Sequence, residues 1–159
     1  SGQEPAAADR ERAFDSIPSP PGATPGAGAT AEARSRALHR GLTLINVLTS
    51  FASGFVQQPM LARKVEAVRS TLAERHKVLA LFEVGSTGSV GFTANAEELL
   101  APFSQRALVD SMAEWVLALV FELQRTFPGS LPRATLRILI ESAGDDLGEL
   151  GFLRALGLD

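Results

Sequence analysis

The sequence lacks cysteine and tyrosine, and it contains only two histidines among 159 residues. Without cysteine the chain has no disulfide, thiol nucleophile, iron–sulfur cluster or thiolate zinc site. His39 and His76 are far apart in the sequence, and each is flanked by basic residues, which disfavours a bound cation. We therefore predict no metal site and no cofactor.

Positive charge is in the minority, with 15 Lys and Arg against 18 Asp and Glu and a net charge of -3. A general nucleic-acid binder normally carries a basic excess, so no nucleic-acid partner is expected. The charge is also unevenly distributed, because residues 31–77 hold eight basic and three acidic side chains, whereas residues 78–159 hold five and eleven. Either the two halves pair within the molecule, or one of them meets a charged partner.

Long hydrophobic runs are missing too. The most apolar stretch, residues 107–123, is shorter than a bilayer span and contains Asp110, Glu114 and Glu122. No secretory signal pattern opens the sequence, since its first residues are polar, acidic and rich in alanine. We expect a soluble protein with no membrane span, located in the cytoplasm or another intracellular compartment.

The first 29 residues are rich in proline, glycine, alanine and serine, which bury too little apolar surface to offset the entropy lost on ordering. We predict a disordered tail over residues 1–29 and a single helical domain over residues 30–159. Within the tail, Phe14 and Ile17 have the spacing of one helical face. They belong either to a short docking helix or to an unstructured end.

The domain has helical periodicity almost throughout. Two apolar stripes between Leu38 and Val56 predict a helix that is buried on more than one side, and Pro59 suits the start of the next helix. Residues 105–126 include a segment that is apolar on every side, which is typical of the helix at the centre of a bundle. The sequence thus predicts an all-α fold, a compact bundle of five to six helices around this central helix.

Several residues have the side chains and the spacing of helix N-caps. These are Thr30, Asn95, Ser104, Ser130 and Asp146. Asn95 and Asp146 are each followed three residues later by a glutamate, which is the spacing of a capping box. They predict a helix directly after each cap, including one over residues 131–142 and a last one that ends near Gly157.

Residues 78–94 fit two structures. They either extend the second helix or form a small β-hairpin around the turn 85–88, because β-branched and aromatic residues stand on both sides of the glycines. The same glycine-rich stretch resembles a phosphate-binding loop in composition, but no Walker lysine follows it and no βαβ unit surrounds it. The hairpin with a simple turn is the favoured interpretation.

Signals for catalysis are weak. The sequence has no Gly-x-Ser-x-Gly elbow, and its adjacent carboxylates stand at predicted helix starts, where the helix dipole explains them. Glu122 is unusual because apolar residues flank it in the central helix, and a buried carboxylate there needs a cationic partner. We predict that the protein is not an enzyme.

The apolar content exceeds what one small bundle needs to cover, which favours an exposed patch or groove. We predict a non-catalytic protein–protein interaction module, an adaptor, assembly factor or subunit, whose partner is another protein or a second copy. The candidate partner-binding residues are Leu44, Leu48, Phe51, Phe55, Trp115, Leu119 and Phe121. A charged contact face is expected from Arg63, Lys64, Arg69, Arg75 and Lys77. The alternative is a ligand-binding or sensory domain that holds a small apolar molecule between helices near Trp115.

Overall fold

The structure is a computed structural model that describes residues 27–93 and 95–158. The described residues form seven α-helices, one 3-10 helix (η1) and one two-stranded sheet. In chain order these are α1 (Ala27–Ala52), α2 (Gln58–Leu72), η1 (Lys77–Leu81), β1 (Phe82–Val84), β2 (Val90–Phe92), α3 (Ala96–Leu100), α4 (Gln105–Thr126), α5 (Arg133–Glu141), α6 (Leu147–Leu150) and α7 (Phe152–Ala155). The chain divides into two units, residues 1–32 and 33–159, and the second contains α1 from residue 33 onward and all later elements. The predicted helical fold with a small hairpin is confirmed.

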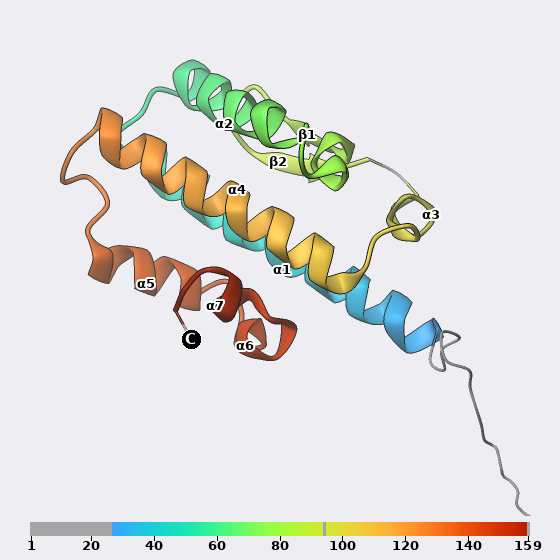
Figure 1. The fold of residues 1–159 in the computed structure, drawn as a ribbon. Coiled ribbons are helices and arrows are strands. Elements are labelled where there is room, and N and C mark those ends of the chain that lie inside the picture. Colours follow the sequence, from blue (N-terminus) through green and yellow to red (C-terminus); the bar gives the residue numbers. More distant parts are fainter. Residues whose placement is uncertain (1–26, 94, 159) are drawn as a thin grey trace, which may run out of the picture. The chain divides into compact units, whose positions relative to one another are not determined.

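Helix α4 has the bounds predicted for the central helix. Within the second unit it lies along α1, with α2 and the hairpin on one side and α5 to α7 on the other (Figure 1). Its inward face is closed to solvent, with exposures of 1% or less at Leu108, Met112, Trp115, Leu119 and Leu123. The hydrophobic core of the unit is therefore built around this one helix.

A glycine allows α1 and α4 to approach each other closely. A Cβ added at Gly41 of α1 would collide with the side chain of Met112 on α4. Glycine has no side chain, so the backbone of α1 fits against Met112 at this point. The close packing of these two helices thus depends on a residue that weakens a helix in isolation.

The hairpin within residues 78–94 is confirmed. Its strands are antiparallel, with Phe82 opposite Phe92, while residues 77–81 before them form a 3-10 helix instead of a longer strand. The turn packs against α2, since Gly88 has a φ of +93° and a Cβ there would lie 3.1 Å from the Cγ atom of Leu61. The glycine-rich stretch is therefore the turn of the hairpin.

Polar and aromatic contacts fasten the hairpin to the helices. The Asn46 side chain of α1 donates to the Val90 carbonyl at 3.0 Å and accepts from the Val90 N–H at 2.8 Å. The Phe82 ring meets the Trp115 ring edge-on, with 5.6 Å between centroids. These contacts fix the sheet against α1 and α4, and neither follows from local sequence.

The predicted helix starts are confirmed only in part. Ser104 caps α4, because its hydroxyl accepts a hydrogen bond from the Ala107 N–H at 3.0 Å. Thr30 is no cap, since α1 already begins at Ala27. Asn95 precedes α3 as predicted, but it has a left-handed φ of 64° and makes no side-chain cap hydrogen bond. A polar residue can thus stand directly before a helix, as predicted, without its side chain capping that helix.

Three predictions near the C-terminus are wrong. Helix α5 begins at Arg133 and not directly after Ser130. Asp146 precedes α6, but its carboxylate makes no cap and instead accepts a hydrogen bond from Arg40 of α1 at 2.6 Å. The expected last helix is divided at Gly151, which has a φ of 99°. This division gives α6 and α7 and raises the number of described helices above the predicted five to six.

Most of the predicted N-terminal tail, including Phe14 and Ile17, lies outside the described residues. Residues 27–29 belong to α1, so helical structure starts before the predicted domain boundary at residue 30. In the part of the chain that the structure describes, no helix combines the length and the apolar character needed to cross a bilayer.

Candidate interaction surface

The seven apolar residues predicted to bind a partner have three different environments. Four of them are core residues with exposures of 3% or less: Leu44, Leu48, Trp115 and Leu119. Phe51 and Phe55 are half-buried and stack edge-on with each other, and Phe55 does the same with Phe127. Phe121 is 67% exposed. Of the seven, it is the one whose side chain stands largely in solvent.

The outward face of α4 carries a second exposed apolar residue. Leu117 is 40% exposed and lies one helical turn before Phe121, so the two side chains share one side of the helix. The sequence analysis did not single out Leu117, although its spacing of four residues from Phe121 is the signal that could have found it. A pair of exposed apolar side chains therefore lies along α4.

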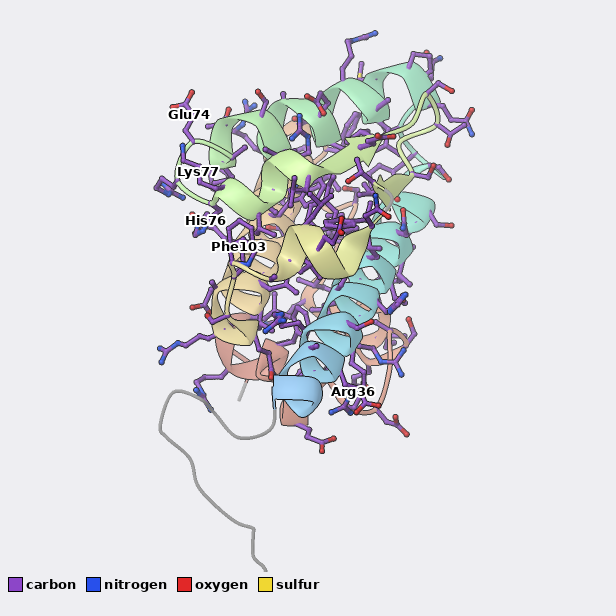
Figure 2. The ribbon with its side chains drawn as sticks, turned by 90° about the vertical axis from the view of Figure 1, so that its right-hand side faces the viewer. Arg36, Glu74, His76, Lys77 and Phe103 are labelled. Atoms are coloured by element: carbon purple, nitrogen blue, oxygen red, sulfur yellow. The ribbon has the colours of Figure 1, made fainter. Side chains whose placement is uncertain are left out.

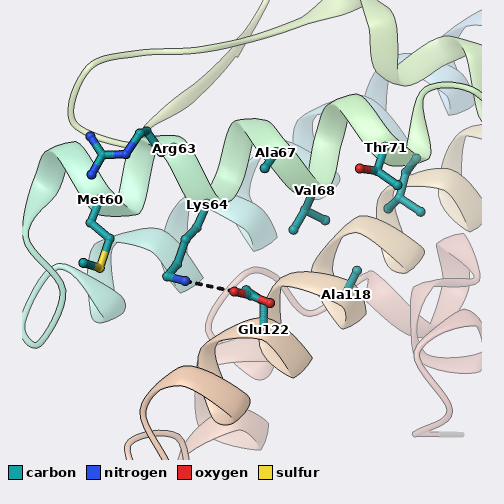
Figure 3. Close-up of a pocket in the computed structure, with 9 residues that line it drawn as sticks. Met60, Arg63, Lys64, Ala67, Val68, Thr71, Ala118 and Glu122 are labelled. Atoms are coloured by element: carbon teal, nitrogen blue, oxygen red, sulfur yellow. Dashed lines mark hydrogen bonds and ion pairs between the residues drawn. The ribbon is translucent and has the colours of Figure 1, made fainter.

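A hollow lies between α2 and α4, and its lining includes Ala118 and Glu122, the residues that follow Leu117 and Phe121 in the sequence. Its volume is about 490 Å³. It is lined by Met60, Arg63, Lys64, Ala67, Val68, Thr71 and Leu72 of α2 and by Ala118 and Glu122 of α4 (Figure 3). Small apolar side chains, Ala67, Val68 and Ala118, occupy its middle, and Met60 at one end is 39% exposed. We call this hollow, together with Leu117 and Phe121, the α2–α4 face.

An ion pair bridges one end of the α2–α4 face. The Lys64 ammonium donates to Oε2 of Glu122 at 2.9 Å, and the Arg125 guanidinium donates to Oε1 of Glu122 at 2.7 Å. The hydrogen bond from Arg125, followed by that from Lys64, outweighs partial burial and lowers the pKa of Glu122 from its ordinary 4.5 to about 2. Glu122 thus has the cationic partners that a covered carboxylate requires.

The five predicted basic contact residues do not form one free face. Three are committed to ion pairs within the unit, namely Lys64 to Glu122, Arg69 to Glu66 and Arg75 to Glu114. Arg69 also donates to the Leu79 carbonyl at 2.9 Å and therefore lies on the side of α2 that faces η1. Arg63 and Lys77 are exposed and make no ion pair with the described residues. Lys77 lies beside His76 beyond the end of α2 (Figure 2).

A series of hydrogen bonds links the end of α2 to α4. The Nε2 atom of His76 lies 2.7 Å from Oε1 of Glu114, and its Nδ1 atom lies 3.1 Å from Oγ of Ser111. These residue types match those of a catalytic triad. However, Ser111 is 3% exposed and its hydroxyl donates to the Ala107 carbonyl at 2.6 Å. The series therefore fastens two elements together and presents no hydroxyl to a substrate.

Among the described residues, no three His, Asp or Glu side chains are placed to hold a metal ion. No protein-family model, curated protein or solved structure matches the chain. The α2–α4 face is accordingly interpreted from its own chemistry.

Proposed function

We propose that the chain is a non-catalytic protein-interaction module that binds an amphipathic helix of a partner along the α2–α4 face. The observation that carries the proposal is an apolar hollow between α2 and α4, together with Phe121, which is 67% exposed and directly precedes Glu122, a lining residue. Single exposed apolar residues are normal on protein surfaces. Met60 instead lines the hollow itself, and the exposed Leu117 and Phe121 each precede a lining residue, Ala118 and Glu122. Exposed apolar side chains gathered around a concave surface are the arrangement that marks binding sites.

The shape of the surface favours a helix as the bound element. Helices α2 and α4 lie side by side and leave a trough between them (Figure 3). A helix presents apolar side chains at intervals of three and four residues, which fill such a trough along its length. Burial of the exposed part of the Phe121 ring would contribute roughly 2–3 kcal/mol. The side chain therefore has the energetic weight of a central contact in an interface.

A small apolar ligand is the second candidate function, and the volume of the hollow supports it. At about 490 Å³ the hollow has the size of small-molecule sites, which range from roughly 300 to 1,000 Å³. The location predicted for such a ligand, near Trp115, is occupied by packed core side chains, since Trp115 is 0% exposed and meets Phe82. The α2–α4 face is the better location for this candidate as well.

The experiment compares two substitutions of equally exposed apolar residues. Phe121→Asp places a charge on the α2–α4 face, and Ile138→Asp places the same charge on α5, where Ile138 is 66% exposed. Affinity capture from extracts of cells that express the full chain is quantified for the wild type and both variants. We expect Phe121→Asp to lose the captured partner by at least about tenfold, because a buried unpaired charge is costly. Ile138→Asp is expected to retain it.

Retention of the partner by Phe121→Asp, or equal loss in both variants, would refute the proposal. Thermal unfolding of each variant confirms that the fold is intact. Light scattering after gel filtration separates a foreign partner from a second copy, because self-association through this face would leave Phe121→Asp monomeric. Native mass spectrometry detects the competing outcome, a small molecule that stays bound to the wild type and is lost from Phe121→Asp.

A further inference from the structure

The charges around the α2–α4 face are unequal at its two ends. At the end near Met60, Lys64 and Arg125 both bind the carboxylate of Glu122, and a third cationic side chain, Arg63, lines the hollow one position before Lys64. Arg63 lines the hollow and has no ion-pair partner among the described residues (Figure 3). This end therefore has an excess of positive charge beside an apolar trough.

The opposite end is close to balanced. Beyond the last turn of α2, Arg75 and His76 both contact Glu114, while Glu74 and Lys77 are exposed with opposite charges (Figure 2). Asp110 pairs with Arg106 on the outer side of α4 at 3.6 Å. The positive excess is thus a local feature of the Met60 end, in a chain whose net charge is -3.

We infer that the helix bound on the α2–α4 face carries acidic residues beside its apolar stripe, at the end that meets Arg63 and Arg125. The inference rests on the proposed function. Complementary charges at the rim of an interface speed association and exclude wrong partners more than they add affinity. The N-terminus of α2, which has no side-chain cap, adds partial positive charge at the same end. Arg63 accordingly determines which amphipathic helices are accepted.

The effect of Arg63 is expected to exceed that of its neighbours. Lys64 and Arg125 are already bonded to Glu122, so a partner carboxylate has to compete with an existing pair. Arg63 has no such commitment among the described residues and is exposed. Its planar guanidinium also binds a carboxylate through two parallel hydrogen bonds, which fixes orientation as well as charge.

The test is a selection of displayed helical peptides of about 18 residues, long enough to follow the trough. Positions on one face vary among apolar residues, and the flanking positions vary among Glu, Lys and Gln. The full chain is the target, alongside the variants Phe121→Asp, Arg63→Glu and Arg133→Glu. Arg133 serves as the matched control because it is exposed on α5 and makes no ion pair with the described residues. Thermal unfolding verifies that each target is folded.

We expect the wild type and Arg133→Glu to enrich Glu over Lys at flanking positions by about fivefold, the effect of one exposed ion pair with Arg63 that a lysine cannot form. Arg63→Glu is expected to remove or reverse this preference. Peptides that depend on Phe121 but show no preference for Glu would overturn the inference and leave the proposed function standing. If no peptide distinguishes the wild type from Phe121→Asp, the proposed function fails, and the inference fails with it.

Discussion

Both faces of α4 carry large apolar side chains, but these side chains have different environments. On the inward face, Trp115 and Leu119 are 0% exposed and pack against the hairpin and the other helices. On the outward face, Leu117 and Phe121 are 40% and 67% exposed. A helix with a segment that is apolar on every side thus supplies the core with one face and leaves apolar side chains in solvent on the other. Burial, and not hydrophobicity, separates the residues that stabilise the fold from those available to a partner.

Two carboxylates border the exposed apolar pair on the outward face. Glu114 and Glu122 flank the exposed apolar pair on the side of α2. Glu122 is bound by Lys64 in the middle of α2, and Glu114 is bound by Arg75, just beyond the end of α2. These ion pairs hold α2 at the edge of the apolar strip without covering it. The inward face instead carries Ser111, whose hydroxyl is occupied by the Ala107 carbonyl and by His76.

The difference between the two faces of α4 is tested most directly by the same substitution on both faces. We expect Leu119→Ala to lower the free energy of unfolding by about 3 kcal/mol, because it removes buried methyl groups and leaves a cavity. Leu117→Ala, two residues earlier and 40% exposed, is expected to cost less than about 1 kcal/mol. Urea unfolding followed by far-UV circular dichroism measures both. Equal costs would mean that both faces belong to the core.

A smaller effect is expected at the ion pair that borders the outward face. Glu122→Gln removes the charge that Lys64 and Arg125 share and should cost about 1–2 kcal/mol at neutral pH, since the carboxylate is only partly covered. The pKa of Glu122 is lowered to about 2 in the folded state, so its stabilisation is present above pH 4.5 and is lost as the pH falls toward 2. The difference between the variant and the wild type should therefore close over this range.

Unfolding free energies at pH 7, 4 and 2.5 test this prediction. The control is Glu141→Gln on α5, which removes an exposed pair with Arg137 at 3.8 Å and should change stability by less than about 0.5 kcal/mol. A Glu122→Gln deficit that persists undiminished at the lowest pH would contradict the assigned role of the charge.

The smallest effect on stability is expected for Phe121→Ser. Because the ring is 67% exposed, its removal should change the free energy of unfolding by less than about 0.5 kcal/mol. Chemical denaturation monitored by the fluorescence of the single tryptophan, Trp115, measures this change. A loss above about 1 kcal/mol would place Phe121 among the structural residues and remove the main support for the α2–α4 face.

Much of the fold could be predicted because its signals are local. The bounds of α4 follow from Ser104 as the cap and from Pro128 and Gly129, which stop the helix after Phe127, and the glycines of 85–88 mark the hairpin turn. The predictions failed where distant residues compete for a side chain. Asp146 has the sequence of a helix cap but bonds to Arg40, which is 106 positions away. No local pattern contains that information.

The sequence could predict what kind of site to expect, but it could not predict where in the structure the site lies. The surplus of apolar residues in the sequence indicated an apolar interaction surface. Phe121 was among the residues predicted to form it, whereas Leu117 and Met60 were not. The five basic residues are spread around the sequence of α2 and the turn after it, and only the packing of α4 shows that Lys64 and Arg75 are committed to ion pairs. Arg63 is the member of this group that remains exposed beside the hollow.

The sequence by itself determined the helical class, the central position of residues 105–126 and the absence of thiol chemistry, because periodicity, composition and capping act over a few residues. Only the tertiary structure decided which side of α4 is covered, where Asn46 and Gly41 allow other elements to approach, and which charges are neutralised. The reason is physical. Burial and ion pairing depend on residues that come together only when the chain is folded, so identical leucines two positions apart, Leu117 and Leu119, are 40% and 0% exposed.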